Sequence, residues 1–163
     1  MRPIALAALL APLASEAAAL SCMQPDFGMA FANWRDAEQR YYLARGTLTP
    51  LGPVPEVPDV MAVQEGMMGG AGMPDLAAPF RFEGVLIGED GLYPRTEEVT
   101  VRVGCAGPWC GGFPGPREAT MALAIGEDGA LSMEVGPCPG TMFEGVSAEA
   151  AQACLRDGAC RLE

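Results

Sequence analysis

Apolar and polar residues alternate through the middle and the C-terminal part of the chain. In the clearest case, Val99, Val101 and Val103 alternate with Thr100 and Arg102, which is the period of a strand with one buried face. Alternation or a high content of strand-forming residues predicts further strands, with turn residues between them. The predicted strands cover residues 40–48, 80–87, 97–103, 120–125 and 131–135. Short strands spaced in this way are typical of a small barrel.

A helical period replaces the alternation near both ends of this region. Phe27, Phe31 and Trp34 mark one apolar stripe, which predicts a helix over about 27–39. Trp34 is expected to anchor the core, with stacking on a ligand as the alternative. Residues 147–156 predict a second helix, because a serine can cap its start and a glycine its end. We therefore expect a mainly β fold, a five-stranded OB-like barrel with an N-terminal and a C-terminal helix, stapled by disulfides.

Residues 49–79 follow neither period and are rich in proline, glycine and methionine. This composition predicts a long inserted loop without regular structure between the first two strands. Its methionines raise the alternative of a Cu(I) site, because thioether sulfur suits that ion. The competing interpretation is that methionine is simply tolerated in a disordered loop. The candidate ligands in this metal alternative are Met61, Met67, Met68 and Met73.

Residues 1–19 have the pattern of a signal peptide: an arginine, a short apolar run and three alanines before the expected cleavage site. Cleavage there leaves a single domain over 20–163, which we expect in the periplasm or outside the cell. Lipid attachment at Cys22 is the alternative, although the aliphatic residue that the motif requires stands one place late, at Leu20. No later run is long enough for a transmembrane helix, so we expect no stable membrane insertion after signal removal.

Six cysteines remain in the expected mature chain. An even number in an exported chain indicates disulfides, but six cysteines can pair in fifteen ways and sequence alone does not choose among them. We prefer local closure where the spacing permits it, which leaves one long-range pair. That pair would constrain the unfolded chain most, by about 4 kcal/mol in the chain-entropy model. The preferred pairs are Cys105–Cys110, Cys154–Cys160 and Cys22–Cys138.

Acidic residues dominate the charge of the 163-residue chain, with 21 Asp and Glu against 10 Lys and Arg and a formal net charge of -11. A protein this acidic repels nucleic acid and anionic membrane surfaces, so no nucleic-acid partner is expected. Histidine is absent, which removes the commonest general base and the commonest zinc ligand.

No motif supplies a complete catalytic site. Trp109-Cys110-Gly111 resembles part of a thioredoxin active site, but the second cysteine that such a site needs is missing. Glu97 and Glu98 would point to opposite faces of a strand. The repeated Ile-Gly-Glu-Asp-Gly lacks the further acidic positions of a calcium loop, so we expect two hairpin turns. We predict no catalytic residues and no cofactor.

The order of elements resembles that of netrin-like and tissue-inhibitor-of-metalloproteinases-like domains. The matching features are Ser21-Cys22-Met23, the segment Tyr41–Gly46 after the first helix, the valine-rich strand ending in Cys105, and Cys138 after the fifth strand. The resemblance implies a small secreted OB-fold barrel with disulfides. It does not imply protease inhibition, because that activity needs an N-terminal cysteine and a Cys-x-Cys motif that this chain lacks.

The expected function is a non-catalytic binding or interaction module, because OB barrels bind many kinds of partner on one face. The partner, an unknown protein or small molecule, is left open. Two alternatives also stay open: a periplasmic Cu(I)-handling or other metal-handling protein that uses the methionine loop, and an enzyme with an unrecognised carboxylate site.

Overall fold

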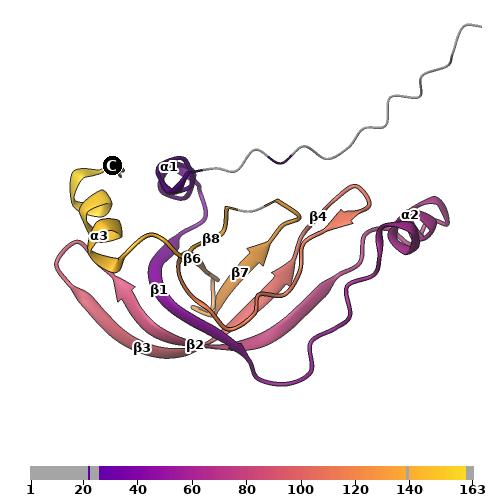
Figure 1. The fold of residues 1–163 in the computed structure, drawn as a ribbon, viewed down its shortest axis with the longest axis horizontal. Helices are drawn as coiled ribbons and strands as arrows, with labels where there is room; N and C mark the ends of the chain where they lie inside the picture. Colours follow the sequence, from indigo (N-terminus) through magenta and orange to yellow (C-terminus); the bar gives the residue numbers. More distant parts are fainter. Residues whose placement is uncertain (1–21, 23–25, 139, 161–163) are drawn as a thin grey trace, which may run out of the picture.

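Five strands form a closed barrel in the computed structural model, which describes residues 22, 26–138 and 140–160 (Figure 1). They follow the order β1-β2-β3-β7-β6, and pairing of β6 with β1 closes the ring. Neighbours are antiparallel except β3 and β7, which are parallel. The expectation of a mainly β, OB-like barrel is therefore confirmed. The strands are β1 (Tyr41–Pro50), β2 (Leu76–Ile87), β3 (Leu92–Val103), β6 (Glu118–Ile125) and β7 (Leu131–Val135).

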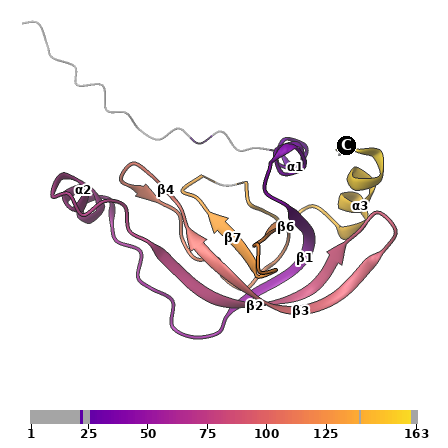
Figure 2. The ribbon, with the colours of Figure 1, turned by 180° about the vertical axis from the view of Figure 1, so that it is seen from behind.

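Helices and short strands surround the barrel. Figures 1 and 2 show α1 and α3 at one end of the molecule and α2 at the other. Within the described part of the chain, no helix is long and apolar enough to cross a membrane. The predicted signal peptide over 1–19 lies outside the described residues. The remaining elements are α1 (Phe27–Asp36), α2 (Val60–Met68), β4 (Cys105–Ala106), β5 (Trp109–Cys110), β8 (Met142–Phe143) and α3 (Ala148–Asp157).

The expectation of an unstructured loop over 49–79 was wrong. The first strand continues through Pro50, α2 occupies the middle of the segment, and the second strand begins at Leu76. The carboxylate of Asp59 caps α2 by accepting a hydrogen bond from the backbone N–H of Ala62 at 2.8 Å. Most residues of α2 favour helices, and the prolines and most of the glycines flank it. Composition averaged over the segment hid this local signal.

Two other boundaries differ from the predicted ones by three residues or more. The first helix ends at Asp36, because the backbone of Ala37 is already extended. The third strand begins at Leu92 and not at residue 97, and it pairs with β2 along its whole length. Pro94 is tolerated there because, among the described strands, only β2 pairs with this part of β3, which is therefore a sheet edge.

The apolar residues form two cores. The alternating residues of the strands point into the barrel, and Val99, Val101 and Val103 are buried as predicted. A second cluster lies between α1, α3 and the barrel end beside them, and it includes Phe27 and Phe31. The largest fully buried side chains are Phe80, Phe82, Leu48, Met121, Leu123, Val99, Val101 and Thr120.

Gly46 and Gly84 are directly paired between β1 and β2. A Cβ atom on Gly46 would meet the carbonyl oxygen of Glu83, and one on Gly84 would meet that of Arg45. The sequence predicted a bend or a bulge at Gly46, and the pairing register passes through this residue without a break. Glycine is required there for the close approach of two backbones.

Three disulfides close the structure, and no free cysteine remains among the described residues. The long-range disulfide joins residues 116 positions apart. The other two span five and six positions, within the β4–β5 hairpin and at the end of α3. The pairs are Cys22–Cys138, Cys105–Cys110 and Cys154–Cys160, the same three that the spacing favoured.

Candidate functional site

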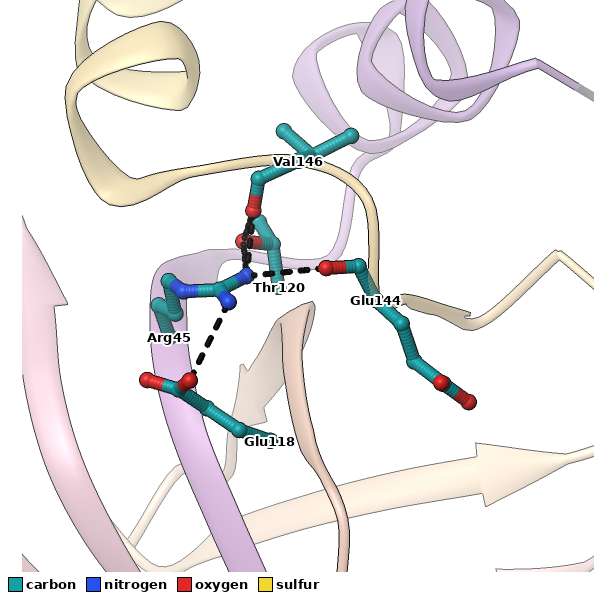
Figure 3. A network of polar contacts seen from close by, with 5 residues as sticks. All are labelled: Arg45, Glu118, Thr120, Glu144 and Val146. Carbon is teal, nitrogen blue, oxygen red and sulfur yellow. Dashed lines mark hydrogen bonds and ion pairs between the residues drawn. The ribbon is translucent and has the colours of Figure 1, made fainter.

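The densest polar cluster of the barrel wall surrounds Arg45 (Figure 3). Its guanidinium donates to the carbonyl oxygens of Val146 and, at 3.4 Å, of Glu144, and it forms an ion pair with Glu118 at 3.2 Å. The hydroxyl of Thr120, which is completely buried, donates to the same Val146 carbonyl oxygen at 2.7 Å. These contacts fix the chain between β8 and α3 against the barrel. Because these contacts hold Arg45 to the barrel wall and to the chain before α3, we assign this cluster a structural role.

The neighbouring carboxylates Glu97 and Glu98 do not line the same hollow. Glu97 lines a hollow of about 450 Å³ with Tyr42, Tyr93 and Arg95, whereas Glu98 is not among the lining residues of that hollow. Within the described residues, no three or more acidic, cysteine or histidine side chains lie close enough together to hold a metal ion. The carboxylate-enzyme alternative stays a prediction.

The pKa shifts have separate, local causes. A hydrogen bond with Asp90 raises the pKa of Tyr93, and a hydrogen bond from Arg35 lowers the pKa of Asp36. Hydrogen bonds at the start of α3, from the backbone and then from Ser147, lower the pKa of Glu149. A catalytic pair would instead need two neighbouring groups whose pKa values are driven apart by a shared environment.

The four methionines of the copper alternative lie on and just after α2. Met61 and Met68 are seven residues apart in this helix, which places their backbones about 10 Å apart along its axis. Met67 is next to Met68 but is turned by about 100° around the helix, and Met73 lies beyond the helix end. A single Cu(I) ion would need the flexible side chains to converge from these separate positions. The copper site stays a prediction.

The exposed side of α2 is unusually apolar. Seven of the ten large apolar side chains that are exposed in the described residues lie between residues 51 and 73. At about 100° per residue, Val60, Met61, Met67 and Met68 follow one side of the helix, and Val63, at the edge of this side next to Val60 and Met67, is buried. Met61 is 64% exposed and Met68 is 74% exposed. We call the side chains of Val60, Met61, Met67 and Met68 the α2 surface.

Only acidic charges accompany the α2 surface in the sequence. No Lys or Arg occurs between Arg45 and Arg81, whereas four carboxylates do. Asp59 caps the helix and Glu65 lies on it, and both are exposed. Asp75, further along, pairs with Arg102 of β3 at 3.3 Å. The α2 surface therefore has negatively charged side chains beside it.

Two adjoining hollows lie on the outside of the barrel beside α1. Trp34, Tyr41 and Ala122 line both of them. We call the first, with a volume of about 360 Å³, the Trp34 hollow. The second, of about 640 Å³, extends over β6 and β7. The Trp34 hollow is lined by Phe31, Trp34, Arg35, Ala37, Gln39, Arg40, Tyr41, Leu43, Ala122, Ile125 and Leu155.

Trp34 serves the core and the hollows together. Its ring makes edge contacts with Phe27 and Phe143, each at 6.0 Å between ring centroids. Phe27 and Phe143 also contact each other, at 5.2 Å. The core-anchor prediction is confirmed in part, because the side chain is only half-buried. Its stacking on a ligand stays a prediction. Arg40 was not singled out from sequence, because α1 ends at Asp36 and the turn after it brings Arg40 to the hollow.

The fold and these surfaces define a class: a disulfide-bonded, OB-like barrel with an exposed apolar helix inserted between its first two strands. Comparison of the chain with protein-family models, with curated proteins and with solved structures found no match. The resemblance to netrin-like domains therefore stays a prediction.

Proposed function

We propose that this protein is exported to the periplasm or the cell exterior and acts there as a non-catalytic interaction module. Its partner is a protein segment that carries apolar side chains on one face and basic side chains beside them. Three disulfides support an oxidising compartment, because such bonds persist where thiols are not kept reduced. The observation that carries the proposal is the α2 surface itself.

An exposed apolar stripe needs a reason, because the parts of its side chains that contact solvent add nothing to the buried core. Methionine adapts its shape to irregular partners and is favoured on surfaces that bind amphipathic helices. The neighbouring carboxylates disfavour an acidic partner, an anionic membrane and a second copy of this chain, which carries a net charge of -11. They favour a basic amphipathic segment.

The area available predicts weak binding. Complete burial of one methionine or valine side chain gains about 1.5–3 kcal/mol, and association itself costs about 4–15 kcal/mol. Four partly exposed side chains assisted by charge therefore support a dissociation constant no smaller than about micromolar. Such an interaction would suit reversible docking.

A designed peptide tests the proposal. The probe is a synthetic amphipathic helix with leucine on one face and lysine on the other, and its control has glutamate in place of lysine. We expect the lysine peptide to bind by calorimetry and the glutamate peptide not to bind. Replacing Met61 and Met68 by Gln should weaken binding at least about tenfold, because it removes apolar burial.

Matched variants separate apolar docking from general attraction of charge. Met29→Gln changes an exposed methionine of α1 and should leave peptide binding unchanged. Glu65→Gln should weaken binding more than Glu127→Gln, although both variants lose one negative charge and both residues are exposed. Equal binding by wild type and Met61→Gln/Met68→Gln would contradict the proposal.

A further inference from the structure

The Trp34 hollow lies beside α1, at the other end of the molecule from α2 (Figure 1). Its volume of about 360 Å³ is within the range of small-molecule sites. Phe31, Leu43 and Leu155 give it apolar walls from α1, β1 and α3. Phe31 and Leu43 are buried members of the second core, so the walls are firmly held. A preformed apolar hollow of this size favours an apolar ligand body.

The cations of the hollow differ in how they are used. Arg35 forms an ion pair with Asp36 at 2.7 Å and also donates to the carbonyl oxygen of Gly158. The amide of Gln39 donates to the carbonyl oxygen of Ile125 at 2.7 Å. The guanidinium of Arg40 has no hydrogen bond or ion pair with any residue that the structure describes. It is the lining cation available to a ligand.

We infer that the Trp34 hollow binds a small amphiphile, an aliphatic carboxylate whose chain lies against Trp34 and whose carboxylate pairs with Arg40. Arginine binds a carboxylate through two parallel hydrogen bonds, which fixes the head group. The net charge of -11 opposes an anion at long range, so recognition depends on this local cation. The adjoining hollow of about 640 Å³ gives room for a longer chain beyond Trp34 and Tyr41.

Trp34 can report binding directly. The chain has two tryptophans, and Trp109→Phe leaves Trp34 as the only indole. In this background we would titrate decanoate, decanol and decyltrimethylammonium, each below its aggregation limit, and follow the indole emission. We expect a saturable change with decanoate, at least about fivefold weaker binding of decanol, and the weakest binding of the cation.

Two variants and one control complete the test. Arg40→Gln should weaken decanoate about tenfold and leave decanol unchanged, whereas Arg95→Gln, an exposed arginine at another hollow, should change neither. Ala37→Leu, at an exposed lining position, should reduce the affinity for both decanoate and decanol by filling the hollow.

The inference is overturned if decanoate gives no saturable change, or if Arg40→Gln binds it as the parent does. It is also overturned if all three amphiphiles bind equally, because that would mark the hollow as a nonspecific apolar surface. Binding of the lysine peptide to the α2 surface should be the same in Arg40→Gln and its parent, so failure at one site is distinguishable from failure at the other.

Discussion

Helices α1 and α2 begin in the same way and are used differently. Each follows an aspartate, Asp26 or Asp59, whose side chain accepts a hydrogen bond from a backbone N–H in the first turn. They have ten and nine residues. Helix α1 buries Phe27, Ala30 and Phe31, whereas α2 buries one residue, Val63.

This difference separates the scaffold from the proposed recognition surface. Burial of its apolar stripe makes α1 part of the second core and one wall of the Trp34 hollow. The apolar stripe of α2 stays in solvent, so its methionines add little to the free energy of folding. These exposed apolar side chains are the basis of the proposed binding role.

Removal of the disulfide near α1 should have the largest effect on stability. Cys22 precedes α1 and is joined to Cys138 after β7, whereas the described part of α2 contains no cysteine. Replacing both cysteines by Ser should reduce the free energy of unfolding by about 4 kcal/mol, because the unfolded chain regains a long loop. Denaturant unfolding measures this loss. A loss below about 1 kcal/mol would mean that the N-terminal lead is dispensable.

The second largest effect is expected from the buried side chains of α1 and α2, whose removal should cost different amounts of folding free energy. Phe31→Ala should cost about 3 kcal/mol, because it leaves a cavity between α1 and its neighbours. Val63→Ala removes the single buried side chain of α2 and should cost about 1–2 kcal/mol. Urea denaturation of both variants checks the order, and an equal or greater loss for Val63→Ala would invalidate the division of roles.

The exposed methionines should have almost no effect on folding. Met61→Gln with Met68→Gln should change the free energy of unfolding by no more than about 0.5 kcal/mol, because both side chains already contact water. Thermal unfolding of this variant beside Met29→Gln provides the comparison. A loss above about 1 kcal/mol would show that these side chains pack in solution.

The smallest expected effect is on the pH dependence of stability, and it involves α3. Of the three described helices, only α3 has an acidic residue in its first turn, Glu149, and hydrogen bonds there lower the pKa of this carboxyl below its ordinary value. A carboxylate with a lowered folded pKa stabilises the fold above its unfolded pKa, and this contribution is lost as pH falls through the folded pKa. Glu149→Gln should therefore flatten the fall in melting temperature below about pH 5. Parallel profiles for both proteins would contradict this.

Local signals determined how much of the fold could be predicted. Ser147 and Gly158 act as the caps expected of α3, and the strand over 131–135 was predicted at its observed bounds. The two copies of Ile-Gly-Glu-Asp-Gly form turns between neighbouring strands as expected, yet only the second contains a glycine with positive φ, Gly129. Identical residues therefore adopt different turns, because the strands around them pair differently.

The candidate sites were harder to predict. Helix α2 was missed because prolines and glycines dominate the segment around it, although its N-cap and its helix-forming residues were visible in the sequence. The Trp34 hollow combines α1, β1, β6 and α3, which are far apart in sequence. No local pattern indicates that Arg40 and Leu155 line the same space. Such a site follows only from the closed barrel and the packing of helices on it.

Replacement of residues 53–74 by a short Gly-Ser linker tests the division between scaffold and recognition surface most directly. We expect the variant to form all three disulfides, to lose no more than about 2 kcal/mol of folding free energy with the burial of Val63, and to lose binding of the lysine peptide. A barrel that no longer folds, or a folded variant that binds the peptide as wild type does, would contradict the account.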